Sequence, residues 1–157
     1  MKPLDYGQPA GLIRRLAALF YDGLLLVALL MTAAGIVVAT LEALNASGAI
    51  NYGIYQDVSD FLSKHPIWSP VFSFYLVFVW VGFFIWFWRK GQTLGMRAWQ
   101  LRVQNTDRTP ISTTQALIRL VTALFGFGNL LVIVTRPKRS LQDICSRSQV
   151  VLAPVKR

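Results

Sequence analysis

The stretch RRLAALFYDGLLLVALL, from Arg14 to Leu30, decides the fold because it opens an apolar segment long enough to enter a lipid bilayer. The apolar run extends from Leu16 to Leu41, and its only charge is Asp22. At about 1.5 Å per residue, a helix of this length exceeds the hydrocarbon thickness of a bilayer and can span it with tilt. A cleaved signal peptide is the alternative, but its apolar region is much shorter and carries no charge. We therefore predict a transmembrane helix.

The composition describes a membrane protein better than a soluble domain, since 54% of the 157 residues are hydrophobic and only 15% are charged. The net charge of +9 would suggest nucleic-acid binding in a soluble chain. Here the basic residues flank apolar segments and no nucleic-acid motif occurs, so they indicate topology and contacts with anionic lipid headgroups. The single cysteine, Cys145, and the single histidine, His65, cannot form a zinc site. We expect no cofactor, no metal and no enzymatic activity, because the sequence offers no nucleophile–base pair.

A second apolar segment, 70–88, carries no charge and is rich in Phe, Trp, Tyr and Val. It has about the length of a spanning helix and ends abruptly at Arg89 and Lys90. Trp86 and Trp88 lie where the aromatic belt of a membrane interface is expected. These features predict a second transmembrane helix.

A third apolar segment, 116–135, differs because Arg119 lies inside it and Gly126–Asn129 interrupts it. If the N-terminus is cytoplasmic, two spans return the chain to the cytoplasm at the basic loop 89–115, in agreement with the positive-inside rule. A straight third span would then carry the basic tail, 136–157, to the outside. A re-entrant hairpin with arms of about 15 Å avoids this conflict. The charge pattern favours the hairpin, and a straight span is the alternative.

Two short stretches predict β-structure. Trp99–Gln104 alternates apolar and polar residues, and Gln149–Leu152 is a short apolar run, so the two could pair as a small cytoplasmic β-ribbon. The outer loop, 42–69, is expected to hold a short helix at Asp57–Ser63. The predicted fold is an all-α membrane protein, with two long transmembrane helices, a Gly-interrupted third segment and a small β-ribbon. It forms a single domain, 1–157, whose membrane segments are about 14–41, 70–88 and 116–135.

The charged residues of the membrane segments predict a site. Arg15, Ala18 and Asp22 share one helical face because they are spaced i, i+3 and i+7. A carboxylate at the centre of a membrane helix costs about 2.5 to 3.5 kcal/mol and usually pairs with another group. Arg119 is the only basic residue inside another membrane segment, so we expect it to pair with Asp22, directly or through water. We also expect Asp143 to meet Arg15 at the cytoplasmic rim.

At these residues the chain resembles the RDD family of bacterial membrane proteins, which is named for one arginine and two aspartates. The resemblance rests on three motifs: Arg15-x-x-Ala18-x-x-x-Asp22, Gly91-Gln92-Thr93-Leu94-Gly95 and Lys138-Arg139-Ser140-Leu141-Gln142-Asp143. It implies that Arg15, Asp22 and Asp143 are the named residues, and that Gln142 stands where members often carry a histidine. It also implies a multi-pass protein of the bacterial cytoplasmic (inner) membrane, for which transport, including cation/proton exchange, has been proposed in some members.

Two functional classes follow. In the first, the protein is a transporter or transporter subunit that exchanges protons and monovalent cations at Asp22, and it is a homo-oligomer because two spans and a hairpin are few to enclose a pathway. In the second, it is a non-transporting scaffold or accessory protein whose Arg and Asp residues fix helix packing. In both classes the N-terminus and the C-terminus are expected in the cytoplasm.

Overall fold

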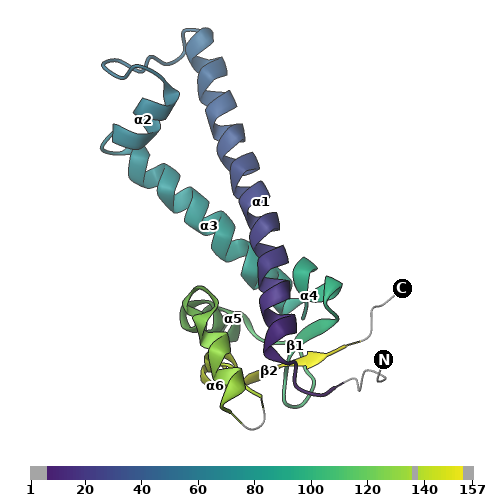
Figure 1. Ribbon diagram of the computed structural model, residues 1–157. Helices are drawn as coiled ribbons and strands as arrows, with labels where there is room; N and C mark the ends of the chain where they lie inside the picture. The colour runs from purple at the N-terminus through teal and green to yellow at the C-terminus, as the bar shows by residue number, and fades with distance from the viewer. Residues whose placement is uncertain (1–6, 136–137, 154–157) are drawn as a thin grey trace. The chain divides into compact units, whose positions relative to one another are not determined.

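The computed structural model describes residues 7–135 and 138–153, and these form two compact units (Figure 1). The first unit contains the described residues up to Leu25 and from Phe83 onward, and the second is Leu26–Gly82. Parts of the predicted basic segments, 1–6, 136–137 and 154–157, lie outside the described residues.

Two helices, α1 (Leu12–Ala46) and α3 (Trp68–Arg89), are long and apolar enough to cross a membrane. Both predicted spans are confirmed. Helix α1 leaves large apolar side chains exposed on the described surface, among them Phe20, Leu24 and Met31. Such a surface is stable in lipid, where the backbone is satisfied within the helix and apolar side chains need no protein cover.

The second unit includes a short helix, α2 (Val58–Lys64), which confirms the helix expected at Asp57–Ser63. Asp57 caps it by accepting a hydrogen bond from the Asp60 N–H at 2.7 Å. The buried residues Val58, Phe61 and Leu62 anchor α2 in a small aromatic and aliphatic core with Tyr52.

His65 connects α2 to α3. Its Nδ1 accepts hydrogen bonds from the Ile67 and Trp68 N–H groups, both at 3.2 Å, and its carbonyl accepts from the Ser69 N–H at 3.0 Å. These bonds satisfy N–H groups at the start of α3 and just ahead of it, as an N-cap does, and Pro66, between His65 and the helix, has no N–H to satisfy. His65 and Pro66 therefore set the start of the second membrane helix.

The first unit adds a two-stranded antiparallel sheet and four short helices. Its elements are α4 (Leu94–Ala98), β1 (Leu101–Asn105), α5 (Thr113–Thr122), η1 (Leu124–Ile133), α6 (Leu141–Cys145) and β2 (Ser148–Leu152). Strands β1 and β2 pair with Val103 opposite Val150, which confirms the predicted ribbon. Val103 and Val150 are buried, and so form the core of the unit with Leu101.

The chain ahead of α1 also joins this sheet. Pro9 forms a bridge with Val151, the Gly7 N–H donates to the Leu152 carbonyl at 2.8 Å, and the Ala10 N–H donates to Val150 at 2.9 Å. No pattern in the sequence predicts this contact. It ties the start of the described chain to its last strand.

The predicted interruption of the third membrane segment is confirmed. Helix α5 and the 3₁₀ helix η1 meet at an angle of 84°, so no straight helix covers 116–135. The break falls at Ala123, slightly ahead of the expected turn, and Gly126 follows with a φ of +103°. Glycine suits this position because a side chain strains a backbone with positive φ.

Candidate functional site

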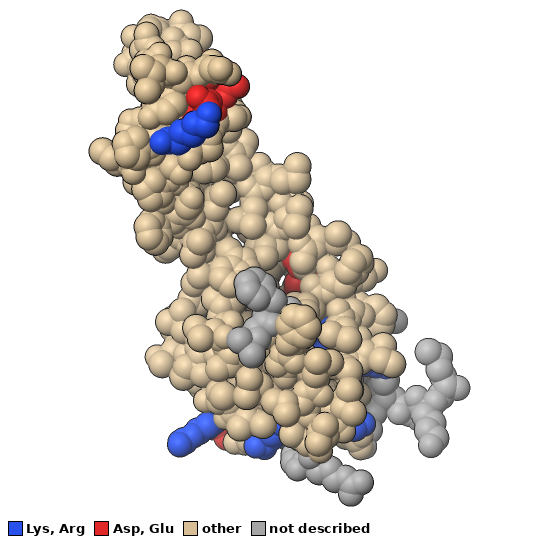
Figure 2. Space-filling model, turned by 60° about the vertical axis from the view of Figure 1, so that its left-hand side comes forward, with Lys and Arg blue, Asp and Glu red and all other residues tan. Residues whose placement is uncertain are grey.

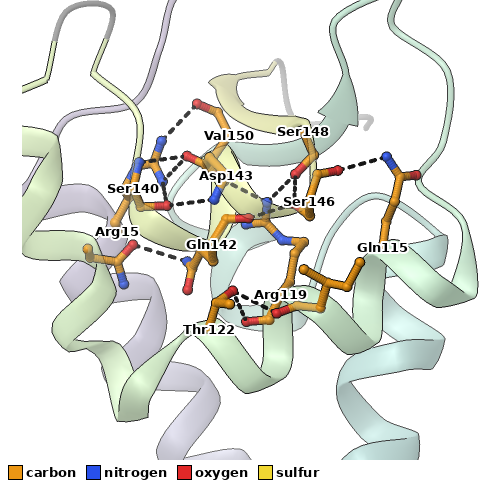
Figure 3. A network of polar contacts seen from close by, with 12 residues as sticks. Arg15, Gln115, Arg119, Thr122, Ser140, Gln142, Asp143, Ser146, Ser148 and Val150 are labelled. Carbon is orange, nitrogen blue, oxygen red and sulfur yellow. Dashed lines mark hydrogen bonds and ion pairs between the residues drawn. The ribbon is translucent and has the colours of Figure 1, made fainter.

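Asp143 lies at the centre of a buried polar cluster in the first unit (Figure 3). It is the third residue of α6, and it forms a capping box with Ser140: the Ser140 hydroxyl accepts from the Asp143 N–H, and the carboxylate accepts from the Ser140 N–H at 3.2 Å. The same carboxylate accepts hydrogen bonds from Arg15 and Arg119, each at 2.7 Å. We call Arg15, Asp143 and Arg119 the triad.

Arg15 reaches the triad from α1 and also binds three backbone carbonyls. Its guanidinium donates to Ala10 at 3.1 Å, to Lys138 at 3.3 Å and to Val150 at 3.4 Å. It therefore connects the first membrane helix with the chain ahead of it, with the approach to α6 and with β2. One side chain thus joins segments that are more than a hundred residues apart in sequence.

Arg119 reaches the triad from α5 and is fully buried. It donates to Asp143 and to the Ser148 hydroxyl, which in turn contacts the Ser146 hydroxyl at 2.7 Å. Its guanidinium carbon lies 5.4 Å from the centre of the Trp88 ring, a cation–π contact at the end of α3. Arg119 therefore joins α5 to α3, α6 and β2.

The triad holds its carboxylate in the charged form. Burial alone would raise the pKa of Asp143, but the Arg119 and Arg15 guanidinium groups hold that pKa below its usual value of 3.8. Two cations facing one anion leave the buried triad with a net positive charge. The Ser140 hydroxyl accepts from Arg15 at 3.2 Å and the Ser148 hydroxyl accepts from Arg119, so neutral acceptors share the two guanidinium charges.

Asp22 occupies a second polar position, in α1. It is buried, and its carboxylate accepts hydrogen bonds from the Thr93 hydroxyl and from the Gly95 N–H, the latter at 2.8 Å. Thr93 is the N-cap of α4, where its hydroxyl accepts from the Met96 N–H at 3.1 Å. The carboxylate of Asp22 thus lies at the positive end of a short helix, a favourable position for an anion.

Gly95 makes this contact sterically possible. A Cβ added there would lie 2.3 Å from the Ala18 carbonyl oxygen and 2.9 Å from the Asp22 carboxyl carbon. Ala18 is buried at the same contact. Gly91, at the other end of the Gly-x-Thr-x-Gly stretch, has a φ of +86° and turns the chain out of α3. These residues therefore dock α4 against α1.

One predicted pair is confirmed, and the direct form of the other is wrong. Arg15 meets Asp143 as expected, but within the described residues Arg119 pairs with Asp143 and forms no direct pair with Asp22. The physical reason is that the α6 capping box presents Asp143 to α5, while the N-terminus of α4 already satisfies Asp22. From the sequence, Thr93 and Gly95 are residues of a family motif, and their contact with Asp22 was not predicted.

Gln142 has a structural contact of its own. Its side-chain Nε2 donates to the side-chain Oδ1 of Asn129 at 3.2 Å, which joins α6 to η1. Across the described residues, no group of three or more His, Cys, Asp or Glu side chains is arranged to hold a metal ion.

A comparison with protein-family models matches residues 9–147 to the RDD family. The matched range contains Arg15, Asp22, Arg119 and Asp143. Comparisons with curated proteins and with solved structures gave no match.

Proposed function

Because the chain belongs to the RDD family of membrane proteins, we propose that it is a non-transporting membrane scaffold or accessory protein. One observation carries this proposal: the named residues Arg15, Asp22 and Asp143 are all used in contacts within the chain. Their contacts hold the first unit together and give it a fixed surface for a partner protein.

The energetics of the triad support a fixed architecture. Breaking a buried ion pair by removing one partner costs about 3–5 kcal/mol, because a buried charge is left unpaired. A transport cycle that separated Asp143 from Arg15 and Arg119 would meet a cost of this order in every turnover. A scaffold keeps these contacts intact.

Proton or monovalent-cation exchange at Asp22 is the second candidate, and one observation favours it. Both donors that contact the Asp22 carboxylate within the described residues, the Thr93 hydroxyl and the Gly95 N–H, are neutral. A buried carboxylate in a membrane helix without a charged partner is suited to take up and release a proton. In this candidate the protein is a homo-oligomer whose copies together enclose a pathway.

Ion flux distinguishes the two candidates. The full chain is reconstituted into vesicles with a pH gradient, and proton flux is compared in Na⁺, K⁺ and Li⁺ for wild type, Asp22→Asn and the exposed control Asp107→Asn. The scaffold predicts no flux above that of empty vesicles for any ion. Wild-type flux that disappears in folded Asp22→Asn and persists in Asp107→Asn would replace the scaffold with exchange at Asp22. Flux that persists in Asp22→Asn would contradict both candidates.

The proposed location is the bacterial inner membrane, with the N-terminus and the C-terminus in the cytoplasm. This orientation is supported by the basic residues that follow the second span, which include Arg89, Lys90 and Arg97. We propose that the protein is not an enzyme and does not bind nucleic acids.

A further inference from the structure

The sheet of the first unit limits the path of the third membrane segment. Strand β1 precedes α5 and η1, and strand β2 follows them, yet the two strands pair from Leu101 opposite Leu152 to Asn105 opposite Ser148. Strands joined by backbone hydrogen bonds lie on the same side of a bilayer. If the segment between them enters the membrane, it must therefore leave it on the same face.

The dimensions of α5 and η1 limit their depth. Ten residues of α-helix extend about 15 Å and ten residues of 3₁₀ helix about 20 Å, whereas the hydrocarbon core is about 30 Å thick. The 84° bend prevents both from lying along the membrane normal. Because Arg119 packs inward against α6, the face of α5 that carries Arg119 does not contact lipid.

The outer face of the same two helices is apolar. Six of the exposed apolar residues of α5, of η1 and of the position directly after η1 make up what we call the interfacial strip: Leu117, Ile118, Val121, Phe127, Ile133 and Val134. Val121 is 76% exposed and lies only two residues after the fully buried Arg119, which places the two side chains on opposite faces of α5. An amphipathic helix with this division of surfaces lies in the interface between headgroups and acyl chains.

The exposed charges of the first unit are almost all basic. Of its described acidic residues, Asp22 and Asp143 are buried and Asp107 is exposed. The exposed basic side chains among its described residues are Arg89, Lys90, Arg97, Arg102, Arg108, Lys138 and Arg147. Figure 2 shows Lys and Arg side chains along the lower edge of this unit. The Lys90 ammonium lies 4.1 Å from the centre of the exposed Trp86 ring, a pair typical of the headgroup level. Lys138 follows closely after the strip.

We propose that α5 and η1 form a membrane-interface element that enters one leaflet to partial depth, and that Lys138 at its end binds anionic phospholipid headgroups. The sheet pairing fixes its entry and exit on one face, the strip supplies the contact with acyl chains, and the basic surface selects the headgroup. Phosphodiester groups of lipids such as phosphatidylglycerol complement this surface in charge.

The depth of the strip is tested with a fluorescent label on the full chain. Cys145, the only cysteine, is replaced by Ser, Val121→Cys is labelled, and quenching is measured in vesicles whose lipids carry a nitroxide either near the headgroup or near the end of the acyl chain. The shallow nitroxide is expected to quench more strongly. The control label at Thr106→Cys, in the exposed turn after β1, is expected to remain unquenched. Stronger quenching by the deep nitroxide, or no quenching at Val121→Cys, overturns the partial depth.

Headgroup selection is tested with the same Val121→Cys label. Quenching by nitroxide-labelled phosphatidylglycerol is divided by quenching by nitroxide-labelled phosphatidylcholine, and the ratio should exceed one. Lys138→Gln should lower the relative affinity for phosphatidylglycerol over phosphatidylcholine about fivefold, which is the effect of about one basic residue near a membrane surface. The control Lys64→Gln, in α2, should leave it unchanged. A ratio of one for wild type, or an unchanged ratio in Lys138→Gln with native circular dichroism, overturns the proposed lipid contact.

Discussion

Asp143 is the residue on which the buried charges of the first unit depend, because both Arg15 and Arg119 donate to its carboxylate. Asp143→Asn keeps the shape of the side chain but removes its charge, and leaves two buried guanidinium groups without a counterion. We expect the free energy of unfolding to fall by about 3–5 kcal/mol, measured by denaturation of the reconstituted protein. Asp107→Asn, in an exposed turn, should change it by less than about 0.5 kcal/mol. Equal stabilities of the two variants would contradict the structural role of the triad.

The lowered pKa of Asp143 predicts sensitivity to acid. In the unfolded chain its carboxyl group titrates near the usual pKa of 3.8, whereas in the folded chain the pKa is lower. Above the unfolded value the group contributes its full stabilisation, and this contribution is lost as the pH falls from about 4 through the folded pKa. Denaturation midpoints measured from pH 7 down to pH 3 should therefore fall more steeply for wild type than for Asp143→Asn. Parallel pH profiles would show that Asp143 does not cause the dependence.

At the residue scale, the sequence was sufficient to predict the partner of Asp143 in α1 but not the partners of Asp22. Arg15 and Asp143 could be matched because each lies at the end of a membrane segment predicted to be cytoplasmic. The partner of Asp22 could not be deduced from charge, because it is a backbone N–H and a hydroxyl at the start of α4. The available signal was the Thr-x-Gly sequence at 93–95, which begins a helix and leaves N–H groups free to bind a carboxylate.

The contact between α4 and α1 depends on the absence of a side chain at Gly95. Gly95→Ala would place a Cβ 2.3 Å from the Ala18 carbonyl oxygen, so α4 must move away from Asp22. We expect a loss of about 1–3 kcal/mol in the free energy of unfolding, the usual range for overpacking. Gly35→Ala, in α1 with no atom within 4 Å of the new Cβ, is the matched control and should be neutral or stabilising. Similar losses in both variants would mean that Gly95 has no special packing role.

The start of α3 depends on the His65 side chain. His65→Ala removes the acceptor for the Ile67 and Trp68 N–H groups, at an expected cost of about 1 kcal/mol. Amide hydrogen exchange, measured residue by residue, should accelerate at these two positions. His65→Asn retains a capping acceptor and should restore most of the protection. Unchanged exchange in His65→Ala would show that the cap does not stabilise this helix end.

At the scale of elements, hydropathy was sufficient to predict α1 and α3 because their apolar runs are long. Helices α4 and α6 were missed because five residues are too few for a periodic pattern. Their signals were chemical: Thr93 and Ser140 are N-caps, and Ser140 with Asp143 forms a capping box. The break in the third segment was predictable because two glycines, Gly126 and Gly128, follow it closely, but its angle depends on how α5 and α6 pack.

For the whole molecule, the sequence predicted a two-stranded ribbon, and the structure adds the chain ahead of α1 to it. The alternation in β1 and the apolar run in β2 indicated strands because their side chains face a core. Pro9 lies in no such pattern, since a single bridge needs no periodic sequence. The consequence is topological, because residues before the first membrane helix are bonded to residues after the last membrane segment.

This bonding predicts that both chain ends lie on one side of the membrane. Alkaline phosphatase, active only outside the cytoplasm, and a fluorescent protein, fluorescent only inside, are each fused after Ala153 of the chain expressed in bacteria. We expect fluorescence and no phosphatase activity, because β2 is hydrogen-bonded to Gly7 and Ala10 ahead of α1 and to β1. Phosphatase inserted at the exposed Gly48, between the two spans, is the positive control and should be active.

Active phosphatase after Ala153 together with an active control would mean that the third segment crosses the bilayer completely. The sheet could not then form in the membrane, since β1 and β2 would lie on opposite faces. Fluorescence after Ala153 with an inactive phosphatase at Gly48 would place both positions in the cytoplasm and contradict α1 and α3 as a pair of spans. The expected combination requires two full crossings and a third segment that returns to the face from which it entered. The positive charge after α3 and the 84° bend between α5 and η1 both favour this arrangement.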